Sequence, residues 1–174
     1  ILAVLPGVPE LLQLPARALL PEAIWGRLSD LAFSDRPLAS TRLGQWSVAA
    51  TLVAERPWLG WGAAAFTLIY PERTGVWHGH PHNLPLDLAI SHGLPVAVLL
   101  VGVVLWLLLR SLQRGLFRAS PYERAWWSAA FILVVLHATD LPLYDGRINV
   151  AGWILLAGLR AACWPQGFRP QQLR

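Results

Sequence analysis

The chain has 174 residues, of which 55% are hydrophobic and only 14% are charged. A soluble domain of this size needs more polar surface than that, so the composition favours a membrane protein. The fourteen basic residues are all arginine, and they are dispersed among apolar runs, which argues against a nucleic-acid partner and fits membrane topology. A single cysteine, Cys163, excludes an internal disulfide and a cysteine-based zinc site.

Two parts are predicted within the first 87 residues. Residues 1–14 are apolar but are broken by Pro6 and Pro9, and we interpret them as the end of a membrane helix. Since the sequence contains no methionine, we expect it to be a piece of a longer protein. Residues 15–87 are predicted to form a loop region outside the membrane that contains short helices.

One of these helices is predicted where residues 40–57 read STRLGQWSVAATLVAERP. Ser40 or Thr41 can accept a hydrogen bond from the first backbone N–H groups, and the helix should stop before Pro57. Arg42 then falls in the first turn, where its guanidinium and the unpaired N–H groups could form an anion site. A solvated charge on an exposed helix is the alternative for Arg42.

Three apolar segments follow within residues 88–164, and we predict a transmembrane helix for each. The first has an uncharged core from Gly93 to Leu109, which can cross a bilayer together with its flanks. The predicted fold class is therefore an all-α membrane protein, with an external helical loop region followed by about three transmembrane helices of a larger bundle. The three segments are 88–109, 125–144 and 148–164.

The arginines predict the orientation of these helices. Four arginines lie in the connection 110–124, whereas the connection 137–147 carries only Arg147. Under the positive-inside rule, the first connection and the tail 165–174 are cytoplasmic, and the loop region faces outward. We therefore expect a multi-pass membrane protein whose outer loops face away from the cytoplasm.

Four of the five histidines lie within residues 78–92, in the approach to the first apolar segment and at its outer end. His78, His80 and His82 alternate, so an extended strand would point them in one direction and could bind a metal. However, Gly79 and Pro81 favour a turn, and no carboxylate lies within four residues, so we predict no metal site. A catalytic base and an incidental polar loop are the other two interpretations.

A histidine at the outer membrane face can take a proton from a hydroxyl near neutral pH. An outward site beside a membrane helix suits a lipid-linked substrate, and most lipid carriers use phosphate or pyrophosphate. Arginine binds such groups through paired hydrogen bonds, and Arg42 is the best placed arginine for this role.

Several motifs lie around these residues and further along the chain. His82 and Asn83 are followed by nine residues and then by Gly93 in a Gly-Leu-Pro turn. Together with its neighbours this run resembles the O-antigen ligase family, whose relatives include the O-antigen polymerases. The resemblance covers about residues 40–160 and is carried by RLGQW (42–46), ERPWLGWGAAAF (55–66), HGHPHNLPLDLAISHGLP (78–95) and HATDLPL (137–143).

The resemblance implies a glycosyltransferase that moves a glycan from undecaprenyl pyrophosphate to a hydroxyl of lipid A–core, without a metal or another cofactor. His82 would activate the acceptor hydroxyl, and Arg42 would bind the pyrophosphate. Asn83, Arg73 and His80 are further candidates for substrate binding. For Asn83 the alternative is a helix cap, and for His80 it is a polar loop residue.

His137 and Asp140 lie three residues apart, and we expect them on one face of the second membrane helix. Such an ionisable pair at membrane depth suggests a functional role, with a hydrogen-bonded helix end as the alternative. Three other functions stay open: an O-antigen polymerase, a membrane transport protein like the relatives named as bicarbonate transporters, and a membrane anchor whose loop binds a protein partner.

Overall fold

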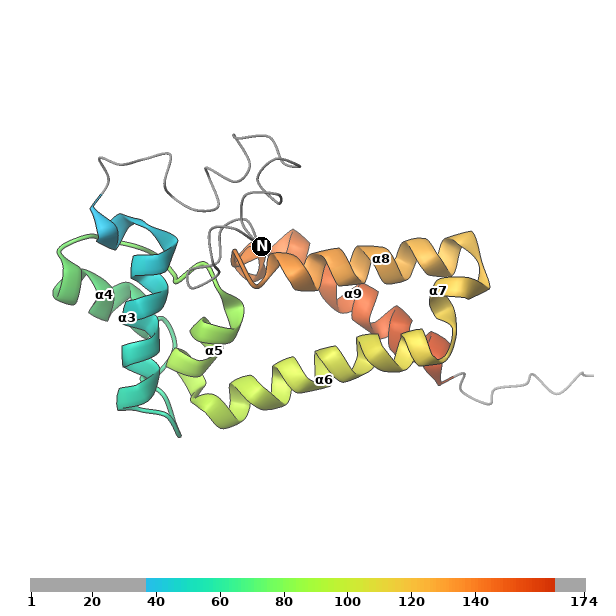
Figure 1. Ribbon diagram of the computed structural model, residues 1–174, viewed down its shortest axis with the longest axis horizontal. Helices are drawn as coiled ribbons and strands as arrows, with labels where there is room; N and C mark the ends of the chain where they lie inside the picture. The colour runs from blue at the N-terminus through green and yellow to red at the C-terminus, as the bar shows by residue number, and fades with distance from the viewer. Residues whose placement is uncertain (1–36, 165–174) are drawn as a thin grey trace, which may run out of the picture. The chain divides into compact units, whose positions relative to one another are not determined.

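The computed structural model describes residues 37–164 (Figure 1). The predicted membrane-helix end at 1–14 and the cytoplasmic tail at 165–174 lie outside the described residues, as does the start of the predicted loop region. Packing divides the chain into two compact units, residues 1–45 and 46–174. Every regular element between residues 37 and 164 is a helix, which confirms the predicted all-α class for this range.

The predicted helix after residue 40 is present. A 3-10 turn, η1 (Leu38–Ser40), leads into α3 (Arg42–Glu55). Thr41 caps the helix, because its Oγ1 accepts the N–H of Gly44 at 3.0 Å. The helix ends two residues before Pro57, as expected, and Arg42 is its first residue.

Two further helices, α4 (Ala65–Thr74) and α5 (Leu84–His92), pack with the part of α3 that belongs to the second unit. Their contact buries large apolar side chains almost completely and gives this region a core of its own. We call this cluster the loop-region core; its buried members are Ala49, Leu52, Ala65, Phe66, Tyr70 and Ile90.

Gly93 separates α5 from the long helix α6 (Leu94–Gln113). Its φ of 84° is unfavourable for other residues, and a Cβ there would clash with the carbonyl of Trp58. The N–H of Leu94 donates to the carbonyl of Pro57 at 2.7 Å, so the turn after α3 is held against this junction. The segment predicted as one span at 88–109 is therefore divided between two helices.

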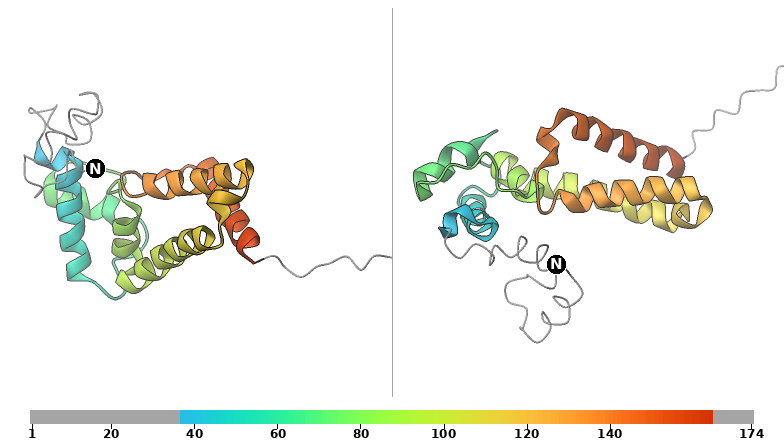
Figure 2. Two further views of the ribbon diagram at one scale, coloured as in Figure 1. Left: turned by 45° about the vertical axis from the view of Figure 1, so that its right-hand side comes forward. Right: turned by 90° about the horizontal axis from the view of Figure 1, so that it is seen from above.

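Beyond α6, a short α7 (Leu116–Ala119) leads to α8 (Pro121–Leu136), and η2 (Pro142–Tyr144) leads to α9 (Gly146–Cys163). α9 packs against both α6 and α8 (Figure 2). Gly158 lets α9 approach α8 closely, because a Cβ there would come within 2.5 Å of the Trp126 ring. The buried members of this helical bundle are Leu107, Leu108, Leu116, Trp127, Ala130, Leu159 and Cys163.

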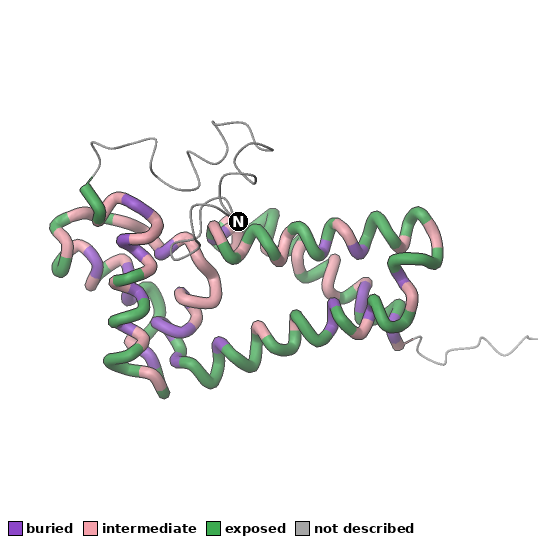
Figure 3. Tube along the Cα trace, viewed as in Figure 1, coloured by how far each residue is buried: buried purple, intermediate pink, exposed green. Residues whose placement is uncertain are grey.

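One stretch of residues 37–164, Leu94–Ala119, is long and apolar enough to cross a membrane. A core helix of a soluble protein would also meet this test, but only 22% of the apolar window is buried here. Figure 3 shows α6 exposed along most of its length. α8 has 16 residues and α9 has 18, so three membrane spans stay a prediction.

Candidate functional site

The histidine loop, residues 78–83, connects α4 to α5 and is held by side chains of the loop region. Thr67 Oγ1 donates to the carbonyl of Gly79 at 2.6 Å, and Trp46 Nε1 donates to the carbonyl of Pro81 at 2.8 Å. His82 has a φ of 48°, a left-handed conformation that is uncommon for a residue with a side chain. Such conformations persist where the surroundings enforce them, and they cluster at functional sites.

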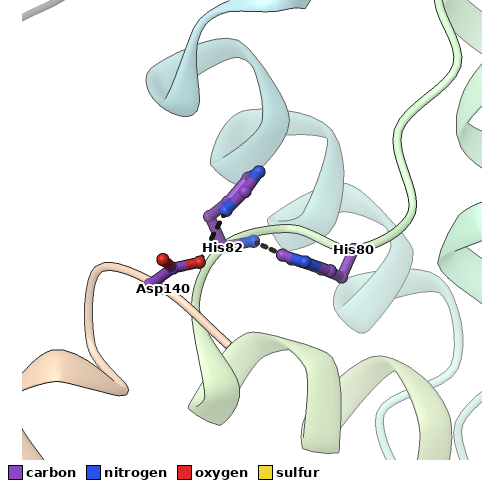
Figure 4. A group of neighbouring side chains, drawn as sticks. All are labelled: His80, His82 and Asp140. Atoms are coloured by element: carbon purple, nitrogen blue, oxygen red, sulfur yellow. Dashed lines mark hydrogen bonds and ion pairs between the residues drawn. The ribbon is translucent and has the colours of Figure 1, made fainter. Parts of the chain in front are cut away.

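His82 pairs with an aspartate from a distant part of the chain. Its Nδ1 lies 2.9 Å from Oδ1 of Asp140, in the connection between α8 and α9 (Figure 4). An ionised carboxylate only accepts hydrogen bonds, so in this contact the Nδ1–H of His82 donates to Asp140. The backbone N–H of Leu141 also donates to Asp140 Oδ1, at 2.8 Å, and fixes the carboxylate.

Backbone contacts bring these two loops together. The N–H of Leu84 donates to the carbonyl of His137 at 2.8 Å, and Asn83 Nδ2 donates to the carbonyl of Ala138 at 3.0 Å. The other amide atom of Asn83, Oδ1, accepts the N–H of Leu86 at 3.0 Å and caps α5. Asn83 thus caps α5, which is one of the two roles considered for it from the sequence. Substrate binding by Asn83 stays a prediction.

The expectation that His137 and Asp140 share one face of a helix is wrong. α8 ends at Leu136, and His137 directs its Nδ1 to the carbonyl of Leu133 at 2.7 Å. The following residues turn because Pro142 disfavours a helical residue before it and because the His137 carbonyl is taken by α5. Asp140 follows this turn: its backbone N–H donates to the carbonyl of Leu136 at 2.9 Å, and its carboxylate reaches the histidine loop.

His80 lies between His82 and Tyr144. Its ring meets the His82 ring edge-on, with 4.3 Å between the ring centroids, and stacks on the Tyr144 ring, with 5.7 Å between the centroids. The Nδ1 of His80 accepts the backbone N–H of His82 at 3.3 Å. Burial, and then the charge of His82, lower the pKa of His80, so its imidazole is neutral at pH 7. Burial also lowers the pKa of His78, whose ring contacts Tyr70.

The two predicted arginines lie elsewhere. Arg73 makes a bidentate ion pair with Glu55, with both N–O distances at 2.7 Å, and hydrogen bonding from Arg73 lowers the pKa of Glu55. This pair uses two of the five guanidinium N–H groups of Arg73, and substrate binding by Arg73 stays a prediction. Arg42 begins α3 in the unit of residues 1–45, and its meeting with His82 stays a prediction.

His80, His82 and Asp140 also form a candidate set of metal ligands, with one N or O atom of each within 4.8 Å of the others. A tetrahedral ion with bonds of about 2.0–2.1 Å needs ligand atoms only about 3.4 Å apart. The short His82–Asp140 hydrogen bond already joins two of the three candidate ligands. The geometry fits a hydrogen-bonded pair better than a metal centre.

Sequence reasoning missed the partner of His82, although it singled out Asp140 as half of an ionisable pair with His137. An apolar cavity of about 340 Å³ lies between α6, α8 and α9. Its lining includes Leu84, Pro85, His137 and Ala138, which neighbour the site residues in the chain.

Comparison with known proteins gives one match. A family model described as O-antigen ligase matches residues 2–101, which are 100 of the 174 residues. The matched range includes Arg42, the histidine loop and α5, whereas Asp140 lies beyond it. Neither the curated proteins nor the solved structures gave a significant match.

Proposed function

Because this chain belongs to the O-antigen ligase family, we propose that it is part of a membrane glycosyltransferase. In this proposal it moves a glycan from undecaprenyl pyrophosphate to a hydroxyl of lipid A–core. The observation that carries the proposal is the contact between His82 and Asp140, because it gives the histidine of the family-like motif the partner that a general base needs.

The proposed reaction is a glycosyl transfer at the anomeric carbon of the sugar that is linked to pyrophosphate. His82 Nε2 takes the proton of the acceptor hydroxyl while the acceptor oxygen bonds to the anomeric carbon and the bond to pyrophosphate breaks. The configuration at that carbon inverts, and the negative charge leaves with the pyrophosphate. Asp140 keeps the proton on Nδ1 and stabilises the imidazolium that forms, as a carboxylate does in other histidine-dependent enzymes.

The departing pyrophosphate needs positive charge, and Arg42 supplies it in this proposal. A guanidinium at the start of α3 acts together with the backbone N–H groups of the first turn. General base help and charge stabilisation contribute roughly 10²-fold each or more. The reaction then requires no metal. Arg73 and His80 are proposed to add secondary contacts to the substrate.

The surroundings of the site suit a lipid-linked donor. The cavity between α6, α8 and α9 is lined almost entirely by apolar side chains, which match the chemistry of a polyprenyl chain. The exposed apolar surface of α6 supports placement in the inner membrane, and the distribution of arginine supports a periplasmic site.

The decisive experiment compares His82→Ala with His92→Ala in the complete protein, expressed in a strain that lacks the gene. His92 is an exposed histidine at the end of α5 and serves as the matched control. We expect His82→Ala to abolish glycan capping of lipid A–core, seen on lipopolysaccharide gels, and His92→Ala to retain it. Normal capping in His82→Ala would refute the general base.

The same gels separate the ligase from the polymerase of the same family, which uses the same carrier and a different acceptor. Uncapped core with free polymer in the deletion strain indicates a ligase. Single repeat units on the core indicate a polymerase. The transport alternative is disfavoured because the core of α6, from Gly93 to Leu109, carries no charged residue.

A further inference from the structure

A second side chain of the α8–α9 connection reaches the histidine loop. Tyr144 lies in η2, four residues after Asp140, and its ring stacks on His80 with 28° between the ring planes. Its hydroxyl donates to Oδ2 of Asp87 at 3.1 Å. The same connection therefore contacts the histidine loop twice, through Asp140 at His82 and through Tyr144 at His80.

Asp87 is unusual because it is a carboxylate that is only 8% exposed. It lies in the first turn of α5, four residues after the capping residue Asn83, where a negative charge is favoured. Burial raises the pKa of Asp87, and the hydrogen bond from Tyr144 opposes that shift. A buried carboxyl group costs free energy unless it is hydrogen-bonded, so Tyr144 and Asp87 hold each other in place.

The consequence reaches His82 through His80. The Nδ1 of His80 accepts the backbone N–H of His82, whose left-handed φ of 48° needs support from its neighbours. Tyr144 covers one face of the His80 ring and limits its rotation. The position of the His82 imidazole is thus set by Asp140 on one side and by His80 on the other.

We propose that Tyr144 and Asp87 are positioning residues, which orient His80 and thereby hold the His82 imidazole in its reactive place. This inference rests on the proposed function of His82. Neither residue contacts the reacting atoms in this proposal. A small displacement of a general base lowers the rate of the chemical step strongly, because proton transfer requires close approach and alignment.

The test uses the complete purified protein and a lipid-linked glycan donor, with kcat and KM measured per folded molecule. Tyr144→Phe and Asp87→Ala each remove the hydrogen bond, and we expect kcat to fall about 3-fold in both. Tyr144→Ala also removes the ring that covers His80, and kcat should fall about 10-fold or more. KM should stay within about 2-fold in all three, because neither Tyr144 nor Asp87 contacts the substrate and His80 makes only a secondary contact.

Two further variants distinguish positioning from a general loss of structure. Asp87→Asn keeps an acceptor oxygen for the Tyr144 hydroxyl and should restore kcat nearly to the starting value. The double variant Tyr144→Phe, Asp87→Ala should be no slower than either single variant, because both remove the same hydrogen bond. Tyr122→Phe and Tyr122→Ala are the controls, since Tyr122 is 88% exposed at the start of α8.

The outcomes separate this inference from the proposed function. If His82→Ala is inactive but Tyr144→Ala matches Tyr122→Ala in kcat, the positioning role is refuted and the general base stands. If the Tyr144 and Asp87 variants lower only the yield of folded protein, the positioning role is refuted as well. If His82→Ala stays active, the proposed function itself fails.

Discussion

The loop-region core buries its apolar side chains, whereas the bundle of α6, α8 and α9 exposes many of them. In the loop-region core, Leu52, Phe66 and Ile90 are closed off almost completely. In the bundle, large apolar side chains point outward, and Val98 and Leu99 of α6 are 66% and 64% exposed. The two regions therefore differ in how much apolar surface they expose.

The two regions obtain their stability from different sources. The loop-region core buries its own apolar surface, as a domain in water does. The bundle leaves a continuous apolar surface that water would disfavour and that lipid or neighbouring helices would accept. The His82–Asp140 pair joins the two, with the histidine from the loop region and the aspartate from the end of the bundle.

The largest expected effect tests whether the site needs both regions. Asp140→Ala leaves His82 without the acceptor that fixes its tautomer, so we expect the transfer rate to fall about 10³-fold. Asp145→Asn on the same connection is the control, because it keeps an oxygen to cap α9. A rate near that of the control would show that the loop region carries the chemistry alone.

A smaller loss is expected at Arg42, which tests the proposed source of positive charge. Arg42→Lys keeps the charge but not the two-pronged hydrogen bonding, and we expect the transfer rate to fall about 10²-fold. Arg56→Lys serves as the matched control, since Arg56 lies over the Trp61 ring at 4.1 Å. Full activity in Arg42→Lys would identify Arg42 as a solvated surface charge.

Stability measurements test whether apolar side chains are buried in the loop-region core and exposed on α6. Leu52→Ala removes a fully buried side chain and should lower the free energy of unfolding by about 2–5 kcal/mol. Leu99→Ala removes an exposed side chain of the same type and should change it by less than about 0.5 kcal/mol. Denaturation in detergent measures both. Equal losses would mean that the outer face of α6 is packed rather than lipid-facing.

The smallest effect concerns pH and the histidine loop. The pKa of His80 is lowered in the folded state, so between that value and the ordinary value near 6.5 the unfolded chain binds more protons. His80 therefore contributes stability that is fully present above about pH 6.5 and is lost as the pH falls toward the lowered pKa.

We expect His80→Asn to be less sensitive than the unaltered protein to a fall from pH 7 to pH 5, measured as the midpoint of denaturant unfolding. The difference between the two proteins cancels the contribution of Asp87, whose raised pKa acts in the opposite direction. Identical pH profiles would show that His80 titrates as a solvated group.

Much of the fold was predictable because it depends on neighbours in the chain. Thr41 and Pro57 set the ends of α3, and the apolar run after Gly93 forms α6. Where the prediction was wrong, a distant contact had replaced a local preference. The end of α8 is an example, because the carbonyl of His137 accepts the N–H of Leu84, a residue more than fifty positions earlier.

Caps, prolines, apolar runs and motif spacing are local properties of the chain, so the helical class and the family could be predicted without a structure, and His82 could be named as a candidate. The contact of Asp140 with His82, and the contacts of Tyr144 with His80 and Asp87, could not be predicted in this way. These groups meet where the α8–α9 connection contacts the histidine loop and α5, and the packing of whole helices determines that contact.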